Sequence, residues 1–141
     1  MNKNNPGFFD VVGYTVTSGR ARSAPSFSEA TVEVRVGSRR VARSASGVGP
    51  VHALDAALRG CLAADFPELE NVRLCDYQVS VLEGQDGTSA EVRVIIQATD
   101  GVSKWDAGSV SQNIIDASFE ALCSAAVMGI LRAQQAARLP A

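Results

Sequence analysis

The sequence predicts an α+β fold: two strand-strand-strand-helix modules, related by a pseudo-two-fold axis, form antiparallel sheets with helices packed on one face. Three observations predict it. A turn of small residues runs into an amphipathic helix twice, at residues 47–58 and 108–119. Short apolar-polar alternations precede each turn. Leu54-Asp55-Ala56 also aligns with Ile115-Asp116-Ala117 at an offset of 61 residues, and a period of this size indicates an internal repeat.

The strands of the first module are read from alternation of apolar and polar residues, the pattern of a strand with one buried face. Residues 8–16 form the first strand, and the Gly-, Pro-, Ser- and Arg-containing segment 18–28 is expected to be a mobile loop. Val32, Val34 and Val36 alternate in the second strand, at 30–36. Gly37-Ser38 suits a tight hairpin turn into a return strand through 41–45.

The second module repeats this order. Residues 77–81 alternate as a strand, 84–87 form a turn, and Val92, Val94 and Ile96 correspond to the three valines of the first module at an offset of 60 residues. Asp100-Gly101 predicts a hairpin leading into residues 102–105. Module one is expected at about 8–66 and module two at about 72–132, with flexible ends at 1–7 and 133–141.

Both helices have apolar stripes at helical spacing. In the first, which Pro50 begins, the stripe is Val51, Leu54, Leu58, Cys61 and Leu62. The closing helix is expected at about 111–132, and its apolar positions cover two adjoining stripes. A helix that is apolar over so wide an arc needs cover on more than one side, so we expect the sheet on one side and a partner subunit on another.

Composition excludes several classes of protein. Of 141 residues, 46 % are hydrophobic and 20 % charged, and the net charge is −2, which gives no bulk attraction to nucleic acid or an anionic membrane. No stretch approaches the ~18 consecutive apolar residues of a membrane span. The N-terminus lacks the regions of a secretory signal. We expect a single cytoplasmic domain with no nucleic-acid or membrane partner.

Few residues here suit catalysis. His52 is the single histidine, which excludes a multi-histidine metal site, and we expect it on the helix surface. Asp55 and Asp116, one per repeat, are early-turn acids that the helix dipole favours. The three cysteines lie in apolar patterns and are read as small core residues. No catalytic residue, metal or cofactor is therefore expected.

The glycine turn is more informative. Gly49 supplies no capping side chain, so the first N–H groups of the helix after Pro50 need water, backbone or a ligand carboxylate as acceptor. The same holds more weakly in the second module, where a serine at 109 or 111 can cap the helix.

Residues 47–58, Gly-Val-Gly-Pro-Val-His-Ala-Leu-Asp-Ala-Ala-Leu, resemble the GxGPVxALxxAL stretch of the C-terminal regulatory (allosteric, dimerisation) domain of 2-isopropylmalate synthases. The second half, with Asp76-Tyr77-Gln78-Val79, Asp100-Gly101, Trp105 and Ala117-Ser118-Phe119, is most similar to the citramalate synthase branch of that family. The resemblance covers residues 8–132. Val48 departs from it, since the family commonly has asparagine there.

The resemblance implies a dimeric regulatory domain, residues 1–141, that binds leucine or isoleucine as a feedback inhibitor in a pocket near the glycine turns, between the modules and against the dimer partner. It also implies that the acetyl-CoA-condensing TIM barrel, absent from this chain, acts in cis or in trans. The implied effector-binding residues are Gly47, Gly49, Pro50, Ala53, Leu54, Asp76, Tyr77, Val110, Ser111, Asn113 and Ile114. Asp76 or backbone carbonyls would hold the ligand's ammonium group.

A second reading stays open. The wide apolar face of the closing helix, Val48 and the altered second turn Gly108-Ser109 also suit a stand-alone dimerisation or scaffold module that has lost its ligand. Because the chain begins at this domain with its own methionine, it is read either as an excised domain or as a stand-alone relative.

Overall fold

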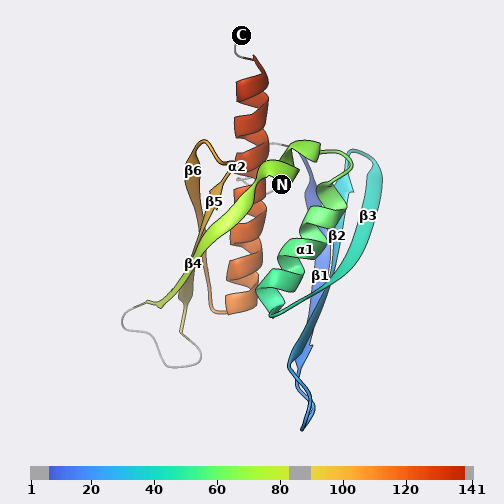
Figure 1. The fold of residues 1–141 in the computed structure, drawn as a ribbon, viewed down its shortest axis with the longest axis vertical. Helices are drawn as coiled ribbons and strands as arrows, with labels where there is room; N and C mark the ends of the chain where they lie inside the picture. Colours follow the sequence, from blue (N-terminus) through green and yellow to red (C-terminus); the bar gives the residue numbers. More distant parts are fainter. Residues whose placement is uncertain (1–6, 83–89, 139–141) are drawn as a thin grey trace. The chain divides into compact units, whose positions relative to one another are not determined.

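The computed structural model describes residues 7–82 and 90–138, which divide into two compact units, Met1–Pro67 and Glu68–Ala141. Unit one contains β1 (Asp10–Gly19), β2 (Phe27–Val36), β3 (Arg39–Gly47) and α1 (Pro50–Leu62). The 3₁₀ helix η1 (Pro67–Asn71) leads into unit two, with β4 (Arg73–Val81), β5 (Val92–Thr99), β6 (Lys104–Ser111) and α2 (Ile114–Arg138). The predicted α+β class and the repeated element order are confirmed (Figure 1).

Each unit is an antiparallel three-stranded sheet with its helix on one face. The middle strands bury alternate residues against the helix, as a strand with one buried face must. In β2 these are Ser28, Ala30, Val32 and Val34, and in β5 they are Val94, Ile96 and Ala98. The core of each unit thus lies between its middle strand and its helix.

The two units repeat at an offset of 64 residues. Ser28 pairs with Gly47 where β2 meets β3, and Val92 pairs with Ser111 where β5 meets β6, so both partners are displaced by 64. The helices begin at Pro50 and Ile114, again 64 apart. The offsets of 60 and 61 read from the sequence are therefore wrong, although the repeat exists.

Helix burial and turn geometry follow the same offset. The buried positions 53, 54, 57, 58 and 61 of α1 correspond to the buried positions 117, 118, 121, 122 and 125 of α2. Gly37 and Gly101, with φ of 63° and 91°, lie at matching places in the two hairpin turns, where positive φ favours glycine. Asp55 and Asp116 do not correspond, so they are not a repeated acid pair.

The first strand of each sheet carries a β-bulge at a matching place, between Val11 and Gly13 in β1 and between Leu74 and Asp76 in β4. Such a bulge inserts one extra residue and redirects the side chains that follow it. Cys75 is the extra residue of β4 and is exposed, so its prediction as a core residue is wrong. Cys61 is buried as predicted, and Cys123 is half-buried.

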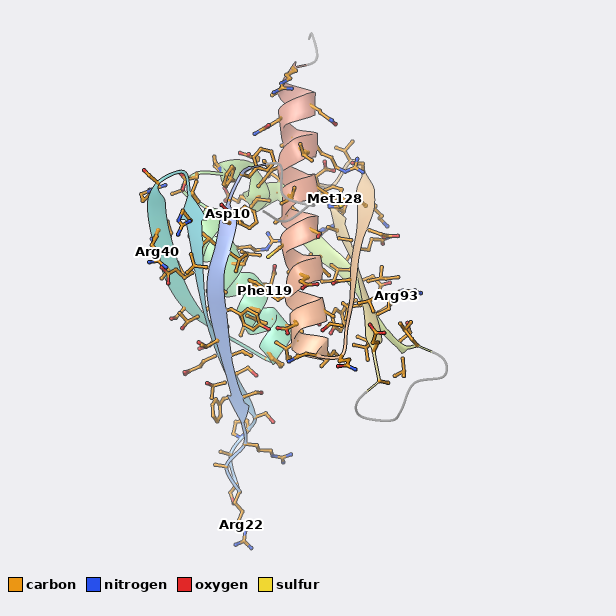
Figure 2. All side chains as sticks on the ribbon, turned by 180° about the vertical axis from the view of Figure 1, so that it is seen from behind. Asp10, Arg22, Arg40, Arg93, Phe119 and Met128 are labelled. Carbon is orange, nitrogen blue, oxygen red and sulfur yellow. The ribbon has the colours of Figure 1, made fainter. Side chains whose placement is uncertain are left out.

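Several predicted boundaries change. The loop expected at 18–28 spans only 20–26, because Ser18 and Gly19 pair with Ser28 and Phe27. This lengthens the β1–β2 hairpin, and Figure 2 shows Arg22 at its far end. In the β5–β6 hairpin of unit two, Val102 lies in the loop and the strand begins at Lys104. The turn predicted at 84–87 lies outside the described residues.

Helix α2 starts three residues later and ends six residues later than the sequence pattern indicates. By length and composition it is apolar enough to cross a membrane, with a mean hydropathy of 1.7 over 18 residues, but half of that window is buried inside the structure. The buried side packs on β5 and β6. There the Trp105 indole N–H donates to the Ala125 carbonyl at 3.2 Å, and the Arg132 guanidinium lies 4.9 Å from the centroid of the Trp105 ring. Helix α2 is thus the core helix of its unit.

Candidate functional site

The turn between β3 and α1 is held by a close approach of backbone to backbone. A Cβ on Gly47 would lie 2.6 Å from the amide nitrogen of Ala53. Only glycine fits there without a shift of the strand end or of the helix. Ala53 and Leu54, both predicted to line a ligand, are fully buried in α1 beneath this turn.

The start of α1 lacks a side-chain cap. Gly49 is the N-cap residue and makes no side-chain hydrogen bond, and Pro50 has no N–H. The Ala53 N–H begins the helical pattern by donating to the Gly49 carbonyl at 3.0 Å. Within the described ranges, the Val51 and His52 amides meet no acceptor. These are orphan donors of the kind that a helix start presents to solvent or to an anion.

The start of α2 has the side-chain cap that the start of α1 lacks. Asn113 occupies the position of Gly49, and its Oδ1 accepts hydrogen bonds from the amides of Ile115 (2.8 Å) and Asp116 (3.2 Å). Ile115 and Asp116 correspond to Val51 and His52 at the offset of 64. The cap expected from a serine in this turn therefore comes from Asn113, while Ser111 Oγ accepts from the Asn113 amide at 3.0 Å. One side-chain oxygen satisfies in α2 the two donors that stay open in α1.

The other residues predicted around the second turn lie on different surfaces. Ile114 takes the first position of α2, where α1 has Pro50, and is 42 % exposed. Val110 pairs with the exposed Arg93, so it faces away from α2, whereas Ser109 and Ser111 lie on the α2 side. The Ser109 hydroxyl donates to Glu120 of α2.

Asp76 and Tyr77 lie on opposite faces of their sheet, as neighbours in a strand do. Asp76 is on the outer face, and its carboxylate accepts from the Tyr77 amide (2.9 Å) and from Gln78 Nε2 (3.0 Å). Tyr77 is on the helix side, because it pairs with the buried Ile96. The two residues therefore cannot present side chains to one surface of this unit.

Ser118 is a residue of interest that the sequence reasoning did not select as a site residue. It is fully buried on α2, and its Oγ lies 2.8 Å from the Tyr77 hydroxyl. This bond fixes the ring of Tyr77, which is 42 % exposed. The available signal was a hydroxyl within an otherwise apolar buried stripe, because a buried polar group needs a partner.

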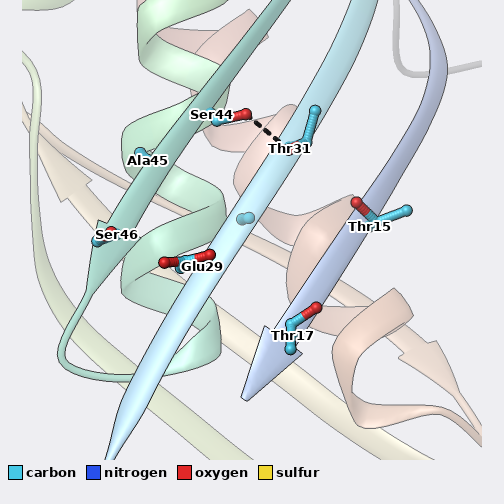
Figure 3. A pocket seen from close by; sticks show the side chains of 8 residues that line it. Thr15, Thr17, Glu29, Thr31, Ser44, Ala45 and Ser46 are labelled. Carbon is cyan, nitrogen blue, oxygen red and sulfur yellow. Dashed lines mark hydrogen bonds between the residues drawn. The ribbon is translucent and has the colours of Figure 1, made fainter. Parts of the chain in front are cut away.

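A polar hollow lies on the outer face of the unit-one sheet, away from α1 (Figure 3). Its volume is about 320 Å³, and it is lined by Thr15, Thr17, Glu29, Ala30, Thr31, Ser44, Ala45 and Ser46. The Thr31 and Ser44 hydroxyls bond to each other across the strands at 2.7 Å. No residue predicted to bind the effector lines this hollow.

The described residues offer little for covalent or metal chemistry. Burial raises the pKa of the Cys61 thiol, and burial raises the pKa of the Cys123 thiol to about 12, so neither forms a thiolate near neutral pH. Within residues 7–82 and 90–138, no three His, Cys, Asp or Glu side chains gather to hold a metal ion. The open Val51 and His52 amides at the start of α1 can instead donate hydrogen bonds to an anion.

A family model described as the LeuA allosteric (dimerisation) domain matches residues 1–130. The chain belongs to this family. The match covers unit one and unit two as far as residue 130, so both β-β-β-α units belong to this LeuA-type domain. The resemblance on which the predicted site rests is thereby confirmed at the level of the family.

Curated relatives of this LeuA-type domain are named (R)-citramalate synthase. The protein of Geobacter sulfurreducens is 44 % identical over 116 residues, 82 % of this chain and 22 % of its own length. The proteins of Streptomyces coelicolor (38 %) and Aquifex aeolicus (39 %) match 89 % and 91 % of this chain, and 24 % of their own lengths. The chain thus spans less than a quarter of each of these relatives, and that part is the dimerisation domain.

Proposed function

We propose that this chain is the effector-binding, homodimeric regulatory domain of a cytoplasmic citramalate-synthase-type enzyme. In this proposal leucine or isoleucine binds at the start of α1 and inhibits a catalytic TIM barrel that is encoded in cis or supplied in trans. A ligand that prefers one state of the enzyme shifts its activity by the difference in affinity between the two states, typically about 1–3 kcal/mol.

The observation that carries the proposal is the pair of open amides on Val51 and His52. In α2 the Asn113 oxygen accepts from the corresponding pair. A carboxylate oxygen of an amino acid has the same acceptor chemistry and also carries the negative charge that a helix N-terminus favours. Val48 is 89 % exposed next to these amides and offers apolar surface to a branched side chain.

Dimerisation is supported by apolar surface in unit two. Tyr77, Val79 and Val81 alternate along β4 on the helix side of the sheet, yet they are 42 %, 39 % and 61 % exposed, because α2 packs mainly on β5 and β6. Such a continuous exposed strip suits an interface. The family description itself names dimerisation.

Thermal unfolding with added leucine, isoleucine or valine tests the effector. A ligand that binds only the folded state stabilises it by about 2.7 kcal/mol at a concentration a hundred times its Kd, which raises Tm by several degrees. If no branched amino acid raises Tm, effector binding is wrong. A dimer in sedimentation that ignores every branched amino acid would instead support the scaffold module without a ligand.

Gly49→Asn tests the site itself. Asparagine is accommodated there, because no atom lies within 4 Å of the position that its Cβ would take, and φ of −156° suits any residue. Its side-chain oxygen would cap the Val51 and His52 amides as Asn113 does in α2, so the variant should be a few tenths of a kcal/mol more stable and should lose the ligand shift. Gly49→Ala adds the Cβ without the oxygen and should weaken binding far less. Equal losses in both variants would show that bulk, not the acceptor, is responsible.

A further inference from the structure

The single histidine does more than occupy the helix surface. His52 is the third residue of α1, and its ring Nδ1 lies 3.1 Å from the Val48 amide nitrogen. An N–H donor needs a lone pair as acceptor, so Nδ1 is unprotonated in this arrangement and the neutral ring carries its proton on Nε2. The contact is a variant of the capping box, in which the third helical residue accepts from backbone N–H before the helix.

This bond holds a segment that has little else to hold it. Val48 stands between two glycines, and its side chain is 89 % exposed, so packing does not fix it. The adjoining residues are fixed by the close approach of Gly47 to α1 and by the bond from Ala53 to Gly49. The Val48 amide itself is tied only by His52 among the described residues.

We propose that His52 is a positioning residue: through Nδ1 it fixes the turn 47–49 that presents the open amides of α1, and it releases that turn when the ring is protonated. Protonation places a hydrogen on Nδ1, and two donors then face each other where a hydrogen bond had been. The effect on the turn stands by itself, whereas the effect on effector affinity rests on the proposed function.

Among the described residues of unit one, the elements packed against α1 place no charged side chain beside His52. On α1 the nearest charges are Asp55 and Arg59, which pair with each other at 3.1 Å. From β3, residues 44–49 contribute no charged side chain, and Arg43 lies two turns along the helix, beside Gly60. The residues of β2 that face α1 are uncharged, and those of β1 on that side, Tyr14 and Val16, are a phenol and a hydrocarbon.

The test uses residues 1–141, whose one histidine makes the imidazole signals unambiguous. Nitrogen-15 NMR of the ring should show the Nε2–H tautomer near pH 7.5, and the Val48 amide should shift together with His52 on titration to pH 5. An Nδ1–H tautomer, or a Val48 amide that does not move with His52, would overturn the proposal. This part needs no ligand.

The second part measures isoleucine affinity at pH 7.5 and 5.5. Loss of the hydrogen bond between Val48 and His52, about 1 kcal/mol net, corresponds to an affinity about fivefold weaker. His52→Phe should show the weaker affinity at both pH values, and His52→Gln, which keeps an acceptor that does not titrate, should bind more tightly than His52→Phe and lose the pH dependence. Tighter binding at pH 5.5, or pH dependence that persists in His52→Gln, contradicts the proposal. If isoleucine binds at neither pH, the proposed function fails, and the NMR titration still decides the role of His52 in the turn.

Discussion

Gly47→Ala should damage the fold at the base of the proposed site. The added Cβ would lie 2.6 Å from Ala53 N, and 3.0 Å from both Ala53 Cα and the carbonyl carbon of His52. Non-bonded carbon atoms attract best at about 3.5–4.0 Å, so the overlap is roughly 1 Å. All three atoms belong to the helix backbone, and no side-chain rotation can relieve the contact.

The size of the effect follows from this geometry. Inserting a methyl group into a filled site costs typically 1–3 kcal/mol, and the rigidity of the contacted backbone puts Gly47→Ala near the upper end, at about 3 kcal/mol. Gly13→Ala is the matched control: no atom lies within 4 Å of its added Cβ, and its φ is not positive. That change should be neutral or stabilising by up to about 1 kcal/mol, since it restricts the unfolded chain.

Urea unfolding followed by far-UV circular dichroism measures the difference as a shift of midpoint at constant m. The single tryptophan, Trp105, lies in unit two, so its fluorescence reports that unit separately. Gly47→Ala should lower the midpoint of the transition that belongs to unit one. If Gly47→Ala and Gly13→Ala unfold within about 0.5 kcal/mol of each other, the close approach of β3 to α1 is incorrect.

Three further predictions concern unit two and the thiols. Tyr77→Phe leaves the buried Ser118 hydroxyl without its partner and should lower the free energy of unfolding by about 1–2 kcal/mol in the same assay. Adding Ser118→Ala should restore most of this loss, and additive effects in the double variant would contradict the bond. A thiol-disulfide reagent at pH 8 should modify the exposed Cys75 rapidly, the half-buried Cys123 much more slowly because burial raises its pKa to about 12, and the buried Cys61 only on unfolding. Three fast equivalents would refute this order. The Ser103 and Val102 amides hold the pKa of Asp100 below its usual value, so the stability that this carboxylate contributes is complete above the unfolded carboxyl's pKa and is lost as pH falls through the lowered pKa. Asp100→Asn should therefore lower Tm at pH 7 and flatten the decline of Tm below about pH 4, and a Tm unchanged at pH 7 would contradict the contribution.

The repeat was visible in the sequence, but its offset was not. Moving a strand by four residues keeps every side chain on the same face, because strands alternate with a period of two. Matching the three valines of β2 at 60 therefore looks as good as the true match at 64. Moving a helix by three residues likewise nearly preserves its face. Strand pairing removes the ambiguity, since Ser28–Gly47 and Val92–Ser111 fix both partners together.

The candidate site was predictable where it depends on backbone chemistry. Gly49 before Pro50 implies a helix start without a side-chain cap, and the structure has that start. The capping by Asn113 depends on where α2 begins. The run of small residues before the helix does not fix that start, which lies three residues after the predicted one. The opposite faces of Asp76 and Tyr77 follow from strand alternation, which the sequence already implies. The exposure of Cys75 depends on the bulge in β4, for which the sequence carries no clear signal.

The cap on α2 also limits how many ligands the proposed site allows in each chain. Asn113 Oδ1 already accepts from the amides at the start of α2, so only the start of α1 is open to a ligand carboxylate. Each chain would then bind one such ligand, and a homodimer two. Because the Hill coefficient cannot exceed the number of sites, inhibition through a single dimer would have a coefficient of two at most. Unit two would then contribute to the fold without binding a ligand of its own, because the Asn113 side chain caps its helix. The response to ligand concentration would be graded rather than switch-like.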